Sequence, residues 1–571
     1  MDDQFWPSVG ALSGVNQLVQ PMWPQWGADS VYQPLVAVNL TAEYQDNDIQ
    51  YLPGLATWNT TDSQTYTFNL RQNINFSNGD PLNAYQVWSE MYAFYYLSGN
   101  ASGWDQSYSV FNMSTSNFGP AVIALMNQSG VVNPSQALLN VMENSSWPIY
   151  VTGPYTIVYH LAAPFVYFPG TLTSYNGLIW DVQFVLQHGG FGTPTTPNTY
   201  FNTVPIPGTG PYIITQVLTD SYITFAQNPD YWGRNLTLQQ ISANPILDPG
   251  HVKNAIIYYK TDDLARYTDL STGAAQIAAI NTPNFNRILA DPTQFGYVSV
   301  PAWGQVATTL ALNTQRYPTN ITDVRQAIAH AINLTQIADE AFFGKLTPFV
   351  GPEYPGWKQF YDLGNLSTYS YNITLAEQYL NESKVDVSTL PTLDFEVEPG
   401  CQWCVTTAQV IQSDLGQIGL TVNIVVSPTF YQYYGPYSTN LANAQQISQL
   451  AYLGSATWAP DALTPADNWL NFVNNQSLYG NWAIYTNPVV QNCVDALTSN
   501  SNVTYIQGLC TQAQQQIYND APYVWLGING LWYGGGSLAY SKGTVTSFLL
   551  DQQWDGSDTL PFINTVLLGG S

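Results

Sequence analysis

The chain has 571 residues, of which 45% are hydrophobic, 14% aromatic and only 9% charged. This length exceeds what one hydrophobic core supports, so two or three domains are expected. The 12 Lys and Arg against 38 Asp and Glu give a formal net charge of −26 at pH 7, which excludes nucleic acid as a partner because phosphate binding needs clustered basic side chains.

The first part of the chain predicts a strand, a tight turn and a helix in succession. Residues 66–71 alternate apolar and polar side chains, as a half-buried strand does. The pair Asn78-Gly79 is typical of a hairpin turn. Asn83 is a favourable N-cap for a helix that begins at Ala84 and carries apolar residues on one face.

Residues 205–233, PIPGTGPYIITQVLTDSYITFAQNPDYWG, predict an antiparallel hairpin that is fixed at both ends. The runs 212–217 and 221–226 alternate as paired strands do. Glycine and proline form a tight turn before the first run, and Tyr231-Trp232 supply a large apolar anchor after the second.

These stretches resemble the extracytoplasmic solute-binding proteins of ABC importers, family 5, which is the oligopeptide- and dipeptide-binding type of structural cluster C. GTGPY and NPDYWG in residues 205–233 match one signature of that family. Residues 52–84, with LPGLATW, YTFNLR and FSNGDPLNA, are similar to its pattern PGLAESW, YTFHLR and F.DGTPLTADDV. VYQPL at 31–35 resembles the family's VYEPL strand, and residues 255–279 resemble IIPD…RLAALQSGEVDIA without the usual acidic pair.

The resemblance implies an α/β fold: a two-lobed, hinged periplasmic-binding-protein-like architecture of type II, with an extra α+β domain inserted in the first lobe. We expect residues 1–50, 168–305 and 520–571 to form the first lobe. Residues 51–167 are expected to form the additional domain, and residues 306–519 the second lobe.

The second half of the chain alternates strand-like and helix-like runs, as a second α/β lobe does. A change of lobe is expected near 307–316, and the apolar run 523–528 is expected to return to the first lobe. The other predicted elements are a helix at 323–337, a strand at 393–398, a helix at 406–418, and strands at 420–426 and 450–453.

The four cysteines predict two disulfides. Cys493 and Cys510 lie in two predicted helices at comparable distances from a polar turn, so an antiparallel helix hairpin would bring them together. Cys401 and Cys404 are close enough to form a small ring. A thioredoxin-like redox site is the rival interpretation of Cys401-Gln-Trp-Cys404, which would need a cytosolic βαβ setting; a structural disulfide is favoured.

The polar surface favours the outside of a cell. With so few charges, the surface is carried by amides and hydroxyls, which stay hydrated when carboxylates are protonated, so we expect an acidic habitat; an acidic surface at neutral pH is the alternative. No run of about 18 apolar residues is present, so no membrane span is expected. A removed signal sequence and an anchor beyond Ser571 are expected.

N-glycosylation sequons are dense, as in an archaeal cell-surface glycoprotein. Asn333 lies in a predicted helix, which makes its modification doubtful. The other candidate glycan sites are Asn39, Asn59, Asn75, Asn100, Asn112, Asn127, Asn144, Asn235, Asn320, Asn365, Asn372, Asn381, Asn475 and Asn502.

Two loops are the candidate ligand-binding segments. Gln402 and Trp403 lie between a predicted strand end and a helix start; Trp403 is predicted either to stack on a ligand or to fill a lobe core. The second loop contains Trp458 and Asp461 and continues to Asp467 and Trp469. It resembles the family's GW.ADYPDPDN loop, whose aspartate meets the α-ammonium of bound peptides. Asp461 is the closest match and Asp467 the second.

We expect capture of oligopeptides or oligosaccharides in an interlobe cleft and their delivery to an ABC permease. Peptide termini require acidic and basic partners, and Arg316 and Arg325 are expected to be structural; abundant Trp and Tyr with amides also suit sugars, so both classes stay open. No catalytic motif is recognised, and neither an enzyme, a cofactor nor a metal site is expected. The alternative is a structural or adhesive surface glycoprotein that keeps the fold without transport.

Overall fold

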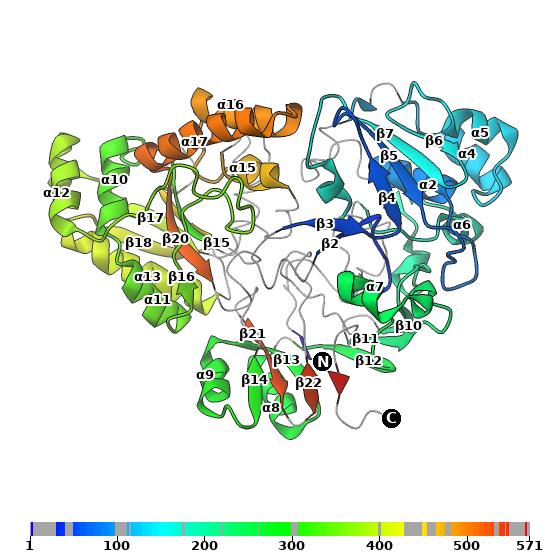
Figure 1. Ribbon diagram of the computed structural model, residues 1–571. Helices are drawn as coiled ribbons and strands as arrows, with labels where there is room; N and C mark the ends of the chain where they lie inside the picture. Colours follow the sequence, from blue (N-terminus) through cyan, green and yellow to red (C-terminus); the bar gives the residue numbers. More distant parts are fainter. Residues whose placement is uncertain are drawn as a thin grey trace. The chain divides into compact units, whose positions relative to one another are not determined.

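The computed structural model divides the chain into two compact units (Figure 1). One unit comprises Met1–Val298 with Leu538–Ser571, and the other comprises Ser299–Ser537. The structure describes residues 2–3, 30–39, 49–97, 111–113, 116–173, 177–218, 221–260, 262–297, 307–397, 401–427, 448–453, 464–473, 481–529, 536–542, 544–547 and 566–567.

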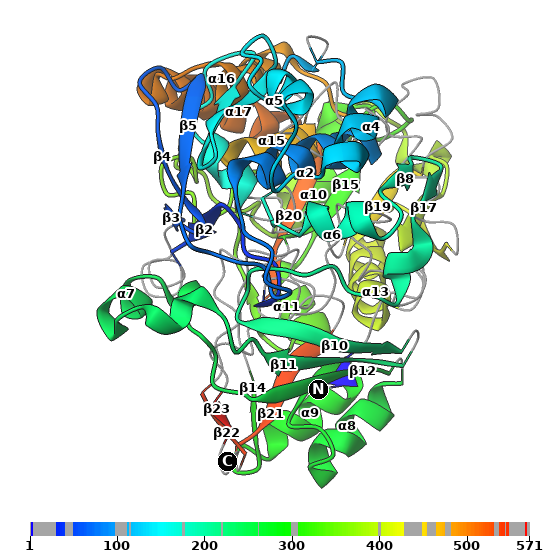
Figure 2. The same cartoon turned by 90° about the vertical axis from the view of Figure 1, so that its right-hand side faces the viewer.

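A seven-stranded sheet forms one part of the first unit, in the order β10-β11-β12-β1-β13-β21-β14. Its three neighbouring strands β12, β1 and β13 are parallel. Helices α8 (Asp263–Thr272) and α9 (Thr282–Ala290) pack on this sheet (Figure 2). The strands are β10 (Tyr212–Leu218), β11 (Tyr222–Gln227), β12 (Asn254–Tyr259), β1 (Asp2–Asp3), β13 (Ile277–Asn281), β21 (Gly536–Ser541) and β14 (Phe295–Tyr297).

The predicted hairpin at 205–233 is confirmed. β10 and β11 pair antiparallel, from Tyr212 opposite Gln227 to Leu218 opposite Tyr222. Alternate residues of β11 are buried, because one face of the hairpin lies on the core. The alternation of the sequence therefore identified both strands and their pairing.

The segment before this hairpin lies against Val31 at very short range. The backbone N–H of Gly210 donates to the carbonyl oxygen of Val31 at 2.8 Å, and the carbonyl oxygen of Gly208 accepts from the N–H of Ser77 at 2.9 Å. A Cβ atom on Gly208 would lie 2.0 Å from the Val31 oxygen. Glycine is required here because a side chain would collide with backbone.

Gln33 joins the same region to the end of the hairpin. Its Nε2 donates to the hydroxyl of Tyr231 at 2.7 Å, and its Oε1 accepts from Nε1 of Trp232 at 2.8 Å. The guanidinium of Arg71 lies 5.1 Å from the centroid of the Trp232 ring, and its Nε donates to the carbonyl oxygen of Gly54 at 2.7 Å. Motifs that are far apart in the sequence thus meet around one glutamine.

A second sheet of the first unit is antiparallel, in the order β4-β5-β7-β6. Helix α2 (Ala84–Leu97) packs against β6 and β7. The N–H of Gln86 donates to Oδ1 of Asn83 at 2.9 Å, so the predicted cap and helix start are confirmed. The remaining elements here are β4 (Ala56–Asn59), β5 (Thr65–Leu70), β7 (Thr156–His160), β6 (Ile149–Gly153), α4 (Pro120–Ser129), α5 (Gln136–Met142) and α6 (Val182–Gln187).

Short elements complete the first unit. β2 pairs with β3, β8 with β9 and β22 with β23, each as a two-stranded sheet. Their bounds, with those of α7, are β2 (Val36–Val38), β3 (Tyr51–Pro53), β8 (Gly192–Thr193), β9 (Thr196–Pro197), α7 (Leu238–Ala243), β22 (Val545–Ser547) and β23 (Val566–Leu567).

The second unit is built on a six-stranded sheet in the order β16-β20-β15-β19-β17-β18. Its strands are β16 (Leu346–Thr347), β20 (Tyr523–Asn529), β15 (Ala307–Leu312), β19 (Leu450–Leu453), β17 (Leu393–Val397) and β18 (Val422–Val426). Its helices are α10 (Thr322–Ala331), α11 (Leu334–Phe342), α12 (Ile373–Glu382), α13 (Gln402–Gln417), α15 (Pro465–Val473), α16 (Pro488–Ser499) and α17 (Val503–Asp520). Mixed strands and helices in both units agree with the predicted α/β class.

Two expectations about the second unit differ from the structure. The helix predicted at 323–337 is two helices, because Ile332 is extended and Asn333 caps α11 by accepting from the N–H of Gln336. The strand β20 does not return to the first unit. It pairs with β15 inside the second unit, where its residues 523–528 are buried.

The two predicted disulfides are present. Cys493 of α16 and Cys510 of α17 are 4.8 Å apart between Cα atoms, in the antiparallel helix pair that the sequence predicted. Cys401 and Cys404 close the second bridge at the start of α13. Among the described residues, no helix has both the length and the apolar character that crossing a membrane requires.

Replacing Gly208 by Ala is expected to lower the free energy of unfolding by about 3 kcal/mol, because the new methyl group collides with the Val31 backbone. Gly508→Ala is the matched control, since the added Cβ in α17 meets nothing within 4 Å. That variant is expected to gain about 0.5–1 kcal/mol from helix propensity. Urea unfolding followed by circular dichroism measures both; equal stability of Gly208→Ala and the parent would contradict the close approach.

Because Glu90 of α2 is buried, we expect the free energy of unfolding to fall as the pH rises. The side chain is 1% exposed, and burial raises its pKa well above the ordinary 4.5, with the Trp180 indole as its hydrogen-bond donor. Above about pH 4.5 the unfolded chain releases this proton while the folded chain keeps it, which costs up to about 1.4 kcal/mol per pH unit. Burial also raises the pKa of Asp181 to about 6, with the same sign between pH 3.8 and about 6.

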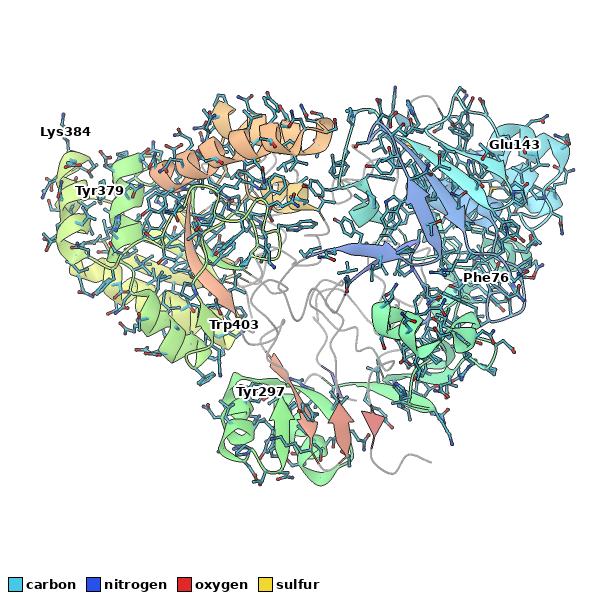
Figure 3. The ribbon with its side chains drawn as sticks, in the orientation of Figure 1. Phe76, Glu143, Tyr297, Tyr379, Lys384 and Trp403 are labelled. Carbon is cyan, nitrogen blue, oxygen red and sulfur yellow. A yellow bond between two sulfur atoms is a disulfide. The ribbon has the colours of Figure 1, made fainter. Side chains whose placement is uncertain are left out.

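Glu90→Gln is expected to remove the Glu90 part of this slope. The exposed Glu143, labelled in Figure 3, supplies the control Glu143→Gln, which should keep the slope of the parent. Urea midpoints between pH 3 and pH 8 provide the measurement. Superimposable profiles for Glu90→Gln and the parent would show that the buried carboxyl does not hold its proton.

Candidate functional site

Four strands of the second unit point their carboxyl ends to one edge of the sheet. β17 runs parallel to β18 and to β19. β15 runs antiparallel to both β19 and β20, so β20 has the direction of β19. In open α/β sheets, ligands bind outside the carboxyl ends of the strands. This carboxyl edge, defined by the ends of β17, β18, β19 and β20, is therefore the candidate site.

The N-terminus of α13 lies directly after β17 at the carboxyl edge. Cys401 is the N-cap residue, and its Sγ accepts from the N–H of Cys404 at 3.2 Å. The first turn of α13 contains no acidic side chain, so the positive end of the helix dipole is not neutralised from within the helix. Gln402, the first residue of the helix, is exposed.

Trp403, labelled in Figure 3, is buried within the second unit. Its ring packs edge-on against Phe342 of α11, with 5.3 Å between the centroids. Burial of this kind supports the packing role that the sequence left open. The ligand-binding role of Trp403 stays a prediction.

The second predicted loop is described only in its last part. Trp458 and Asp461 lie outside the described residues. Asp467 lies on α15, and its side chain is not described. Trp469 on the same helix is fully buried, so it belongs to the core of the second unit.

The two arginines that were expected to be structural lie at the opposite edge. Arg325 donates to the carbonyl oxygens of Asp520 and Thr319, each at 2.8 Å, just before β20 begins. Arg316 follows the end of β15, and its Nη2 lies 3.8 Å from Oδ2 of Asp394. Since β15 runs against the other strands, neither arginine follows a strand that ends at the carboxyl edge.

The chemical character of the whole carboxyl edge was not evident from the sequence alone. The segments that follow β17, β18, β19 and β20 are 398–400, 428–447, 454–463 and 530–535, and they lie outside the described residues. Their sequences contain no Lys or Arg; Glu398 and Asp461 are their acidic residues. Their aromatic residues are Phe430, Tyr431, Tyr433, Tyr434, Tyr437, Trp458, Trp532 and Tyr533. The composition was visible in the sequence, but only the strand directions group these segments together.

The two α/β units define the class of the two-lobed solute-binding proteins, and solved members of that class share the fold. The ABC transporter substrate-binding protein CtaP of Listeria monocytogenes superposes with a TM-score of 0.72 over 99% of both chains at 15% identity. DppA of Helicobacter pylori in complex with the peptide STSA has a TM-score of 0.63, at 17% identity, over 99% of this chain and 97% of its own.

The chain belongs to the bacterial extracellular solute-binding proteins, family 5, whose model matches residues 50–477. The family predicted from the sequence is therefore confirmed, and it consists of solute-binding proteins, not enzymes. The nickel-binding periplasmic protein of Escherichia coli is 27% identical over 343 residues, which are 59% of this chain and 53% of the relative. Di/tripeptide-binding protein 2 of Pseudomonas aeruginosa is 25% identical over 392 residues, 68% and 65% of the two chains. These matches span about half to two thirds of the relatives.

Exchanging Trp403 for Ala is expected to lower the free energy of unfolding of the second unit by about 3–5 kcal/mol, because the contact with Phe342 is lost and a cavity remains. Gln402→Ala, one residue away and exposed, is the control and should change it by less than about 0.5 kcal/mol. Urea unfolding followed by tryptophan fluorescence and circular dichroism tests both. A Trp403→Ala variant as stable as Gln402→Ala would place the indole outside the core.

Proposed function

We propose that this chain captures small peptides outside the cell for an ABC importer and holds them by the amino end. The observation that carries the proposal is the chemistry of the carboxyl edge. Its segments combine aromatic rings and the carboxylates of Glu398 and Asp461 with a complete lack of Lys and Arg. A carboxylate binds an ammonium group strongly, and aromatic faces pack against apolar side chains.

The amino end of a peptide suits this edge better than its carboxyl end. A peptide carboxylate needs a cation, and the basic side chains of this protein are engaged in its own fold in several places. Arg266, which is fully buried, donates to Asp263 at 3.0 Å; Arg71 and Arg325 donate to backbone carbonyls. We therefore propose that the carboxylate of Asp461 or Asp467 binds the α-ammonium group of the peptide. No basic side chain of the carboxyl-edge segments binds the carboxylate at the other end of the peptide.

Relatives of this chain include nickel-binding and di/tripeptide-binding proteins. The described residues hold no group of three or more His, Cys, Asp or Glu that would suit a metal ion. The sequences of the carboxyl-edge segments contain neither His nor Cys, so their side chains suit a peptide better than a transition-metal ion.

The same proposal places the chain on an archaeal cell surface with N-linked glycans. Among the described sequon asparagines, Asn39 and Asn333 are half-buried and the others are exposed, whereas Asn100 and Asn475 lie outside the described residues. Asn372 and Asn502 cap helices through Oδ1, so this hydrogen bond does not involve Nδ2, the atom to which a glycan is attached. The intact mass of protein from its native host tests this: a mass equal to that of the polypeptide would contradict it.

Thermal shift with modified peptides tests the proposed function. A tripeptide with free ends should raise the melting temperature, and amidation of its carboxyl end should leave the shift unchanged. Acetylation of its amino end should weaken binding by roughly 10- to 100-fold, because a charge-assisted hydrogen bond worth about 1.5–3 kcal/mol is lost. Asp461→Asn or Asp467→Asn should have the same effect as acetylation.

Glu377→Gln supplies the control, since Glu377 is an exposed carboxylate on α12 of the same unit. Oligosaccharides form the second set of ligands in the same assay. Loss of binding on amidation, with acetylation tolerated, would contradict the proposed orientation. A shift with oligosaccharides alone would replace the peptide by a sugar, and no shift with either class would favour a surface glycoprotein without transport.

A further inference from the structure

The Cys401–Cys404 bridge lies where a strand passes into a helix. β17 ends at Val397, α13 begins at Gln402, and β18 then pairs with β17 in parallel. The bridge thus occupies the turn of a βαβ unit, with Cys401 as the N-cap of a helix that continues to Gln417. The βαβ part of the setting that the thioredoxin-like interpretation requires is therefore present, and periplasmic oxidoreductases use such Cys-x-x-Cys pairs as cytosolic ones do.

The two cysteines of this bridge differ in burial. Cys401 is half-buried, whereas Cys404 is fully buried. The N–H of Cys404 donates to Sγ of Cys401 at 3.2 Å, and no carboxylate lies in the first turn of α13. A backbone donor and a helix N-terminus whose first turn contains no acidic side chain both stabilise negative charge on the sulfur of Cys401.

The second disulfide of the chain provides an internal comparison. Cys493 and Cys510 are both fully buried, within the bodies of α16 and α17. Neither lies at a helix N-terminus, and an attacking thiolate has no exposed sulfur to reach. The Cys401–Cys404 bridge therefore combines a partly exposed cysteine with stabilisation of the Cys401 thiolate. The Cys493–Cys510 bridge has neither.

We propose that Cys401–Cys404 is a thiol–disulfide exchange site for small thiols and dithiols. The thiolate of a dithiol attacks Sγ of Cys401, the Cys401–Cys404 bond breaks, and its electron pair leaves on Sγ of Cys404, which takes a proton from solvent. The second thiolate of the reagent then attacks the mixed disulfide and releases the Cys401 thiolate, which takes the second proton from solvent. In balance, the dithiol is oxidised to a disulfide by two electrons, and the protein disulfide is reduced to two thiols.

This site is independent of the solute, so its test needs no peptide. The native, oxidised protein is treated with dithiothreitol, quenched at intervals with iodoacetamide and mapped by peptide mass spectrometry. We expect Cys401 and Cys404 to be alkylated at least about tenfold faster than Cys493 and Cys510, with an unchanged circular dichroism spectrum. Equal rates, or reduction that requires denaturant, would overturn the proposal.

Two single variants test the assigned roles of the sulfurs. Cys404→Ser leaves the half-buried thiol of Cys401, which should react with Ellman's reagent at least about tenfold faster than the buried Cys404 thiol left by Cys401→Ser. Cys493→Ser, which leaves the buried Cys510, is the matched control and should react slowly. A faster reaction of Cys404 than of Cys401 would contradict the attack on Cys401. If a variant fails to fold, the rates measured on the parent protein still decide the proposal.

Discussion

The first unit depends on one close approach of backbone to backbone. Gly208 and Gly210 bring the segment before the β10–β11 hairpin onto Val31, with space for no Cβ atom at either glycine. The same few residues bind the loop after β5 and the start of α6, because the carbonyl oxygens of Gly208 and Pro207 accept from the backbone N–H groups of Ser77 and Asp181, respectively. Every group in these bonds is backbone, and its position cannot adjust as a side chain can. The segment before the hairpin, the loop after β5 and the start of α6 are therefore fixed to one another at a rigid junction.

In the second unit, strand direction separates two kinds of chemistry. At the amino ends of the four co-directional strands, Arg325 and Arg316 bind carbonyl oxygens and a carboxylate of the unit itself. The segments at the carboxyl ends contain aromatic and amide side chains and no basic residue. Arg325 and Arg316 thus serve packing at one edge, and the sequences that follow the strands at the other edge contribute no basic side chain.

Low charge also affects how the helices begin. Their N-terminal N–H groups need acceptors, and in this protein amide side chains supply many of them. An amide does not titrate, so such caps persist when carboxylates gain protons. Asparagine is the capping residue at Asn83, Asn333, Asn372, Asn487 and Asn502. Burial likewise raises the pKa of the Glu90 carboxyl, so this side chain also favours the folded state at low pH.

The sequence by itself determined the local features, because each depends on residues that are close in the chain. The β10–β11 hairpin, the Asn83 cap and the pairing of Cys493 with Cys510 follow from alternation, capping chemistry and helix length. The family signature likewise lies in short motifs.

The tertiary structure alone decided features with distant partners. β20 pairs with β15, although more than half of the sequence of the second unit lies between them. The burial of Trp403 depends on Phe342. Helix α10 ends before the extended residue Ile332, where the chain turns to pack α11. The carboxyl edge also became visible only when the strand directions were known. Packing partners far along the chain set these outcomes, and a pattern that spans a few residues carries no information about them.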